Sequence, residues 1–252
     1  MDKEKVGSFY NVVWTEYIPQ YKESEKHWEI FYSSEEVKNK SVLDAGCGTG
    51  IFSIIFSNKG ASPITGIDIS EGSLQTGRNL MKKFNIKNIN FMKQDMLRLP
   101  FDNESFDIVW AWGTVHHTTA PFKAISELIR VLKKGGSLFL AVYTRTKVTF
   151  IHEMIRKTLI HTPQKTWKWL SKIMAFFLTP VVFLFKKREK SRKGETLEEL
   201  IMDWYFVPIR HYYYPREIKE YLEKRGLTIE KFLPASGRFN STSNFIYKAR
   251  KI

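Results

Sequence analysis

A glycine-rich stretch between Asp44 and Gly50 contains the residue types and spacing that point most directly to chemistry. It reads Asp-Ala-Gly-Cys-Gly-Thr-Gly and directly follows a short apolar run. Glycines allow the backbone to turn tightly, and a ligand can lie against them because no Cβ atom intervenes. In an open parallel sheet such a turn lies at the carboxyl ends of the strands, where ligands bind. We therefore expect a cofactor site at this turn.

Two classes of cofactor use this geometry, and the positions of the glycines separate them. A dinucleotide-binding fingerprint, G-x-G-x-x-G, needs its third glycine at position 51, which is Ile51. The pattern here is D-x-G-x-G-x-G, with an acid at the end of the expected strand. In this the sequence resembles the first motif of the class I S-adenosylmethionine (SAM)-dependent methyltransferases, in particular the broad type 11 methyltransferase domain.

The resemblance covers roughly residues 40–145 and includes four further motifs, one of which, at 132–137, is the structural turn before the fifth strand. Residues 66–70 resemble the second motif, whose acid, here Asp68, accepts hydrogen bonds from both ribose hydroxyls. The turn at 93–96 resembles the adenine-binding turn, and residues 106–117 resemble the motif that faces the methionine part of SAM. The resemblance implies SAM as cofactor and the following binding residues: Asp44, Gly46, Cys47, Gly48, Asp68, Ile69, Asp95, Met96 and Trp112.

Methyl transfer from SAM makes few demands on the protein. The acceptor must be held near the methyl group, water must be excluded, and a proton must be removed when the acceptor is a hydroxyl or an ammonium group. No covalent enzyme nucleophile is needed. Cys47 is therefore assigned to the glycine turn and not to catalysis, and we expect no metal site.

Three histidines are candidates for the base. His116 and His117 follow the fourth expected strand, where a histidine can take a proton near neutral pH; alternatively, the pair only fixes the loop. His211 lies in an aromatic segment, 203–215, that resembles one closing the acceptor pocket in family members acting on small metabolites and glycan or lipid precursors. Alternatively, this segment packs the neighbouring insertion against the core. His211 is our first choice of base, and the expected acceptor-binding residues are Trp204, Tyr205, Tyr212 and Tyr213.

The elements that must position these residues follow from the hydrophobic pattern. Short apolar runs alternate with helical periods between about 41 and 143, which predicts parallel strands joined by crossover helices. The expected fold is α/β: a Rossmann-like, doubly wound, mostly parallel seven-stranded sheet with a helical insertion before the last strands. Strands are expected at 41–45, 64–68, 89–93, 106–111, 137–143, 227–233 and 243–249, and helices at 51–58, 121–133 and 215–226.

This pattern divides the chain into four parts. Residues 1–40 form an N-terminal helical cap, 41–145 the SAM-binding core, 146–213 a basic helical insertion or substrate lid, and 214–252 the completion of the core sheet. Within the cap, the aromatic stripe of Tyr10, Trp14 and Tyr17 either covers the cofactor or packs as buried surface.

The insertion carries most of the excess positive charge. The net charge is +14, and residues 145–195 contain thirteen Lys or Arg residues but three acids. Within them, residues 173–185 are uncharged, too few to span a bilayer, and interrupted by Pro180, which we expect to kink a helix. This stretch is a lid over the substrate pocket, a contact with an anionic membrane through 165–193, or a homodimer contact.

The expected function is methyl transfer from SAM to a small-molecule or lipid-like acceptor, with oxygen favoured. The alternatives are an RNA methyltransferase that uses the basic insertion, and a non-catalytic SAM-binding module that serves a partner protein. Nucleic acid is the less favoured partner because the basic run 186–193 has no interleaved aromatics for base stacking. The single cysteine and the lack of a signal-peptide core predict a cytoplasmic location, with a membrane-peripheral one as the alternative.

Overall fold

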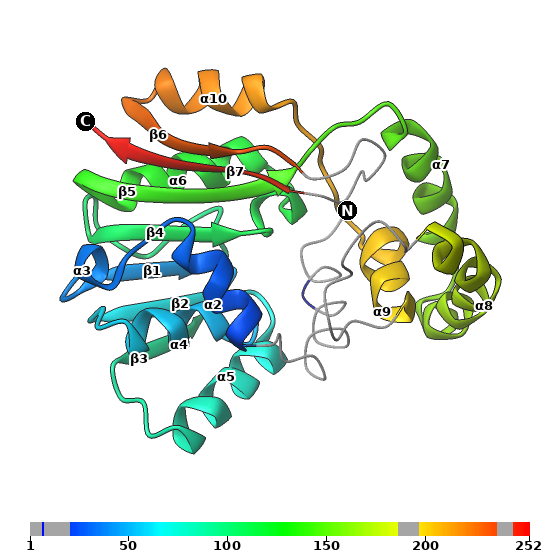
Figure 1. The fold of residues 1–252 in the computed structure, drawn as a ribbon, viewed down its shortest axis with the longest axis horizontal. Helices are drawn as coiled ribbons and strands as arrows, with labels where there is room; N and C mark the ends of the chain where they lie inside the picture. The colour runs from blue at the N-terminus through cyan, green and yellow to red at the C-terminus, as the bar shows by residue number, and fades with distance from the viewer. Residues whose placement is uncertain (1–6, 8–20, 186–196, 236–243) are drawn as a thin grey trace.

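A single seven-stranded sheet forms the centre of the protein (Figure 1). The computed structural model describes residues 7, 21–185, 197–235 and 244–252. Among the strands that the structure describes, the order is β3-β2-β1-β4-β5-β7-β6, and β7 runs antiparallel to both of its neighbours, β5 and β6. The strands are β1 (Val42–Ala45), β2 (Ile64–Asp68), β3 (Ile89–Lys93), β4 (Phe106–Trp112), β5 (Leu132–Tyr143), β6 (Leu227–Leu233) and β7 (Asn244–Lys251). The predicted fold class is confirmed.

Helices cover both faces of this sheet, because alternate residues of each buried strand point to opposite sides. Side chains of α6 (Pro121–Val131) and α10 (Pro215–Glu223) pack on the face that carries Leu43, Val109 and Leu140. Side chains of α2 (Tyr21–Glu29), α4 (Ile51–Asn58) and α5 (Glu71–Lys83) pack on the face that carries Val42, Trp110 and Phe139. The core is therefore two apolar layers with the sheet between them.

The boundaries of most elements agree with the hydrophobic pattern. The main difference is at β5, which begins at Leu132, whereas the pattern predicted a helix to residue 133 and a strand from 137. Leu132 pairs with Phe106 of β4, and the register then shifts between Phe106 and Ile108. This irregularity accommodates Gly135, whose φ is +71°, inside the strand, so the glycines that indicate a helix end in the sequence belong to a bulged strand entry.

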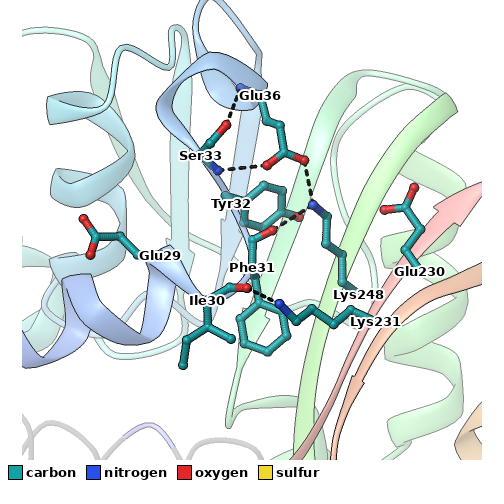
Figure 2. Close-up of a pocket in the computed structure, with 9 residues that line it drawn as sticks. All are labelled: Glu29, Ile30, Phe31, Tyr32, Ser33, Glu36, Glu230, Lys231 and Lys248. Carbon is teal, nitrogen blue, oxygen red and sulfur yellow. Dashed lines mark hydrogen bonds and ion pairs between the residues drawn. The ribbon is translucent and has the colours of Figure 1, made fainter.

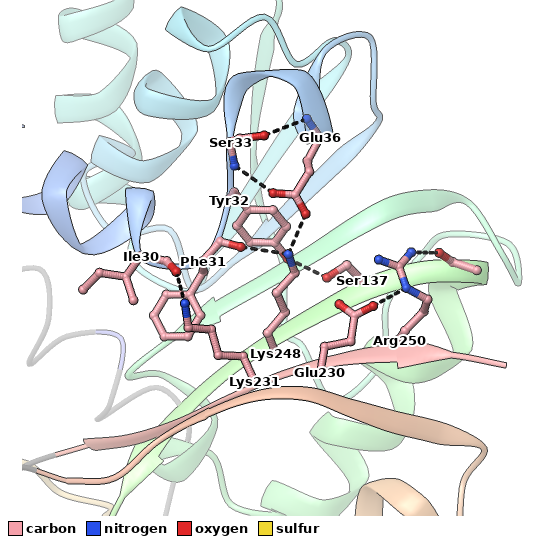
Figure 3. A network of polar contacts seen from close by, with 11 residues as sticks. Ile30, Phe31, Tyr32, Ser33, Glu36, Ser137, Glu230, Lys231, Lys248 and Arg250 are labelled. Carbon is pink, nitrogen blue, oxygen red and sulfur yellow. Dashed lines mark hydrogen bonds and ion pairs between the residues drawn. The ribbon is translucent and has the colours of Figure 1, made fainter.

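The N-terminal part is tied to the far edge of the sheet by two lysines. Lys231 of β6 donates to the carbonyl of Ile30 (2.5 Å) and Lys248 of β7 to that of Phe31 (2.8 Å), just after α2 ends, as Figure 2 shows. Positive charge at a helix C-terminus is favourable because the last carbonyls carry partial negative charge. Lys248 also pairs with Glu36 of the short helix α3 (Ser34–Val37), in the wider polar network of Figure 3. Tyr10, Trp14 and Tyr17 lie outside the described residues.

A helical lobe follows β5, as predicted for the insertion, and we call residues 146–185 and 197–213 the insertion lobe. It contains α7 (Thr149–Leu159), α8 (Trp167–Phe185), α9 (Leu197–Ile201) and a π-helical turn, η3 (Met202–Phe206). In Figure 1 it lies beyond the carboxyl ends of the parallel strands, such as β4 and β5. Its own small core contains Trp167, Ile201 and Phe206. The apolar stretch 173–185 is the second part of α8, which runs through Pro180 without a break.

None of the helices in the described part of the chain is both long and apolar enough to cross a membrane. The basic run at 186–193 lies outside the described residues.

Candidate active site

The glycines of the turn between β1 and α4 differ in the space around them: Gly46 and Gly50 pack closely against Thr114 and Phe91, whereas Gly48 is open. Gly50 has a φ of +77°, and a Cβ atom there would lie 2.2 Å from Cζ of Phe91. Gly48 has a φ of +53°, and a Cβ atom there would have no heavy atom of the described residues within 4 Å. A ligand can therefore approach the backbone at Gly48, whereas Gly50 is needed for the turn to close on β3.

Phe91 of β3 packs against this turn and is a residue that the sequence analysis missed. A Cβ atom at Gly66 or Gly77 would lie 2.6 or 2.9 Å from the same ring, so three glycines from β2, α5 and the turn make room for it. The signal in the sequence was Gly77, because glycine costs about 1 kcal/mol inside a helix and usually marks a close approach there.

Asp68 joins the end of β2 to the glycine turn. Its Oδ2 accepts from the backbone N–H of Gly48 (2.9 Å) and its Oδ1 from that of Ser70 (2.8 Å). Burial raises the pKa of the carboxyl, and these backbone hydrogen bonds oppose the rise. A carboxylate has about four acceptor positions, so it can still accept from two vicinal hydroxyls of a ligand. The next residue, Ile69, lies close to the chain's N-terminal part: a Cβ atom at Gly7 would be 3.5 Å from its carbonyl oxygen.

Asp44 and Cys47 have buried side chains at this turn. The Asp44 side chain is buried, and its Oδ2 accepts from Oγ of Ser53 in α4 at 2.6 Å. Burial raises the pKa of Asp44 to about 7. Burial also raises the pKa of the Cys47 thiol, which keeps it protonated and unreactive. The side chains of these two predicted cofactor residues are thus buried, whereas the backbone at Gly48 is open.

The ends of β3 and β4 meet beside the same turn. The Oγ1 hydroxyl of Thr114 lies 3.3 Å from the carbonyl oxygen of Ala45 and 3.7 Å from Sδ of Met96, and it can donate to either. Asp95 accepts the backbone N–H of Leu97 at 2.9 Å, which shapes the turn after β3. Trp112 is half-buried, its ring 7° from parallel to Phe139 and in edge contact with His27 of α2. The predicted residues around Gly46 and Met96 therefore come together at one edge of the sheet.

An open glycine surface and a carboxylate able to accept from two hydroxyls fit a nucleoside. The adenine and ribose of SAM have this chemistry, so the described residues fit the cofactor that the sequence motifs imply.

The three histidines have different environments. His116 is fully buried against Tyr143, and neither ring nitrogen has a hydrogen-bond partner in the part of the chain that is described. Burial holds the pKa of His116 well below 6.5. Nδ1 of His117 lies 2.8 Å from the carbonyl oxygen of Ile209, so this ring connects the loop after β4 to the segment before His211. The backbone N–H of His211 donates to the carbonyl of His116 at 2.9 Å, which brings all three candidates together.

A cavity of about 800 Å³ lies between the starts of α6 and α7 and the segment 210–214. We call it the lobe cavity. His211 is half-buried in its wall, and burial lowers the pKa of the imidazole. The other lining residues mix aromatic rings with charged and hydroxyl groups: Pro121, Phe122, Arg145, Thr146, Lys147, Thr149, Phe150, Glu153, Arg210, Tyr212, Tyr213, Tyr214 and Glu217.

The four predicted acceptor-binding residues divide into two pairs. Tyr212 and Tyr213 line the lobe cavity. Tyr205 is buried in the insertion lobe, where its hydroxyl lies 2.8 Å from Nδ1 of His152, and the carbonyl of Trp204 accepts from Arg210 at 2.7 Å. Trp204 and Tyr205 therefore make these contacts within the insertion lobe and do not line the lobe cavity.

A buried arginine, which the sequence analysis counted only as charge, positions this segment. Arg156 of α7 is 5% exposed and donates to both oxygens of Glu153 at 2.8 Å. It also donates to the carbonyls of Val207 (2.8 Å) and Pro208 (3.1 Å). Burial opposes ionisation of Glu153, but the hydrogen bonds and charge of Arg156 hold its pKa below the usual value. The i, i+3 spacing of an acid and an arginine was the available signal.

Comparison with known families gives one match over most of the chain. A family model described as "Methyltransferase domain" matches residues 36–190, which include the glycine turn, the ends of β2, β3 and β4, and part of the insertion lobe.

Named relatives align with about two thirds of this chain. The ubiquinone biosynthesis O-methyltransferase of Coxiella burnetii is 28% identical over 161 residues, 62% of this chain and 68% of the relative. The demethylmenaquinone methyltransferase of Lactococcus lactis subsp. lactis is 29% identical over 173 residues, 68% of this chain and 67% of the relative.

Solved structures have the same fold. The magnesium protoporphyrin IX methyltransferase of Synechocystis PCC 6803, crystallised with bound SAH, superposes with a TM-score of 0.64, at 18% identity over 100% of both chains. A SAM-dependent methyltransferase from Aquifex aeolicus superposes with a TM-score of 0.53 at 19% identity, over 90% of this chain and 89% of the other.

Proposed function

Because this chain belongs to the class I SAM-dependent methyltransferases and uses SAM as cofactor, we propose that it methylates an oxygen of a small, amphipathic, quinone-like acceptor. The acceptor binds in the lobe cavity, and His211 takes its proton. The observation that carries this proposal is the cavity itself, where aromatic rings and one half-buried histidine share a wall. Ubiquinone and menaquinone in the names of the relatives support the same acceptor class.

The cofactor supplies an activated methyl group, so the protein's residues bind, orient and move a proton. Asp68 accepts hydrogen bonds from the sugar while the backbone at Gly48 lies against the nucleoside. We also propose that the cofactor contacts four further residues: Ile69, Asp95, Met96 and Trp112. Tyr212 and Tyr213 hold the acceptor through ring contacts and hydroxyls.

His211 can act as the base because its half-buried imidazole lies in the cavity wall, and burial lowers its pKa. Its imidazole is then neutral at pH 7 and has a nitrogen lone pair for the acceptor hydroxyl. His117 and His116 act on this residue in our proposal: His117 fixes the segment through Ile209, and the backbone carbonyl of His116 holds the N–H of His211. They are positioning residues.

The proposal is tested by incubating the purified protein with methyl-labelled SAM and three fractions: a lipid extract, a polar metabolite extract and total RNA. We expect label in the lipid extract. Label confined to RNA would support an RNA methyltransferase instead, and tight SAM binding without label in any fraction would support a non-catalytic SAM-binding module.

The role of His211 is tested by His211→Asn. General-base catalysis contributes about 10²- to 10⁴-fold, so kcat should fall by that factor while SAM affinity is unchanged. His161, an exposed histidine after α7, provides the matched control His161→Asn, which should keep full activity. An unaltered kcat in His211→Asn would assign the proton to another group.

A further inference from the structure

Helix α7 turns its charged residues inward and its apolar residues toward the outside. Its charged pair, Glu153 and Arg156, points into the protein, where the guanidinium group bonds the carbonyls of Val207 and Pro208. Its large apolar side chains point outward: Phe150 is 72% exposed, Ile151 56%, Met154 55% and Ile155 40%. Residues at i, i+1, i+4 and i+5 share one side of a helix, so these four form a continuous apolar strip.

Helix α8 has a second outward apolar face. Trp169 is 62% exposed, Phe176 75% and Phe177 69%. Their spacing of seven and eight residues puts them on one side of the helix. The other side is occupied by the lobe core, which includes Trp167, Leu170 and Met174. The lobe therefore already has a core, and the outer aromatics of α8 add nothing to it.

The charges around these two faces are almost all positive. The described residues 145–179 contain seven Lys or Arg residues and one acid, Glu153, which is already paired with Arg156. The six that do not face inward are all exposed: Arg145, Lys147, Lys157, Lys165, Lys168 and Lys172. In the sequence, α8 is followed by another basic run, 186–193.

Exposed Phe, Trp and aliphatic side chains among lysines match the surface of an anionic bilayer. Apolar side chains enter the boundary between headgroups and acyl chains, Trp favours that depth, and each nearby Lys or Arg adds about 1 kcal/mol of attraction. A protein partner could cover the apolar strip as well, but a partner for six exposed cations would have to be strongly acidic. An anionic lipid surface supplies both the negative charge and the apolar environment, and it does not need a shape complementary to the protein.

We propose that the outward faces of α7 and α8 dock the protein on an anionic lipid bilayer, lying in the interface without crossing it. The lobe cavity adjoins this surface, because Phe150 belongs both to the apolar strip of α7 and to the cavity wall. An amphipathic acceptor then passes from the bilayer into the cavity. This second step rests on the proposed function, whereas the docking itself does not.

Vesicle flotation tests the docking without SAM or acceptor. The full chain is mixed with phosphatidylcholine vesicles, or with equimolar phosphatidylcholine–phosphatidylglycerol vesicles. We expect flotation with the anionic vesicles only, and a marked loss of flotation at high salt because the exposed lysines are screened.

Two pairs of substitutions locate the docking surface. Ile151→Ser with Met154→Ser, and Phe176→Ser with Phe177→Ser, should each weaken binding to anionic vesicles by about tenfold or more, since even partial burial of two such side chains is lost. Phe84 is 58% exposed at the end of α5, on the sheet side of the molecule, and Phe84→Ser is the matched control that should float like the wild type. Thermal unfolding of each variant checks that the fold is retained.

Several outcomes would overturn the docking proposal. They are no flotation of the wild type, equal flotation of all variants, and a stable dimer that only the Phe176/Phe177 variant dissociates. The last would assign the surface to a second copy of the chain. Methyl transfer is measured separately with a lipid extract dissolved in detergent, where the Phe176/Phe177 variant should keep wild-type activity. Intact methyl transfer by a wild-type protein that does not float would overturn the docking alone, whereas flotation of a wild-type protein without methyl transfer would overturn the proposed function alone.

Discussion

The cofactor edge of the sheet and the insertion lobe distribute polar and apolar groups in opposite ways. At the cofactor edge the apolar residues are buried in two layers, and polar groups such as Asp68 stand at the strand ends. In the lobe, the guanidinium groups of Arg156 and Arg210 are buried while Phe150 and Phe176 are exposed. Buried apolar and exposed polar side chains are favourable where water covers the surface. Exposed apolar side chains are favourable where something other than water covers them.

The two regions also differ in how their functional residues are held. The cofactor edge is held by backbone: the turn at Gly48 bonds Asp68, and the N–H of Gly46 donates to the carbonyl of Ile67 at 2.7 Å. The lobe cavity depends on side chains distant in sequence, such as Arg156 with Val207. The cofactor edge should therefore keep its fold and its SAM affinity when a substitution destabilises the lobe. Four predictions test this separation.

The largest effect is expected from Arg156→Met in the lobe. Removing one member of a buried ion pair costs about 3–5 kcal/mol, here because Glu153 and the carbonyls of Val207 and Pro208 lose their donor. Hydrogen exchange should show faster opening of residues 197–212, with β1 and β2 still protected and SAM affinity unchanged. Replacing both partners, Glu153→Leu with Arg156→Met, should recover part of the loss. Equal loss of protection in the sheet would mean that the two regions unfold as one.

A somewhat smaller effect is expected from Gly50→Ala at the cofactor edge. The left-handed backbone costs about 1–2 kcal/mol with a side chain, and the clash with Phe91 about 1–3 kcal/mol more. Gly48→Ala should cost only the first part in a urea unfolding experiment, because the space beside it is open. SAM affinity, measured by calorimetry, should fall in Gly48→Ala relative to wild type. Equal stabilities of the two variants would contradict the division of roles between these glycines.

Asp68→Ala should weaken SAM binding by about 2–3 kcal/mol, or about thirty- to 150-fold, since hydrogen bonds to a charged acceptor are lost. Calorimetry measures the change, and Asp102→Ala, at an exposed acid in the loop before β4, is the control. Flotation on anionic vesicles should be the same in both variants, because the cofactor edge plays no part in docking. Unchanged SAM affinity would remove Asp68 from the cofactor site.

The smallest effect concerns pH and the buried His116 between the two regions. Because its folded-state pKa lies well below 6.5, the unfolded chain binds a proton that the folded protein does not when pH falls below about 6.5. Stability should therefore be unaffected by this group above that pH, and fall as pH decreases below it, by at most about 1.4 kcal/mol per pH unit. Urea unfolding of wild type and His116→Met across this range measures the contribution. A slope that persists in the variant would assign it to other groups.

Much of the cofactor edge could be predicted because its signals are local. The turn at Asp44–Gly50 and the acid at Asp68 each combine a strand end with the residue that follows it, so spacing along the chain is also spacing in the fold. Phe91 escaped prediction since its role depends on glycines from three separate elements. The sequence also did not show that Tyr205 packs inside the lobe whereas Tyr212 lines the lobe cavity, because both are aromatic and only their neighbours differ.

The sequence by itself determined the fold class, the order of strands and helices around the glycine turn, and the cofactor, because each follows from periodicity and residue type within a few positions. Only the tertiary structure decided which histidine lies in a cavity wall and which is sealed in the core, and that α7 turns its charges inward. Those outcomes depend on contacts such as His117 with Ile209 and Arg156 with Val207. Such contacts join residues far apart along the chain, and no local pattern of charge or hydrophobicity encodes them.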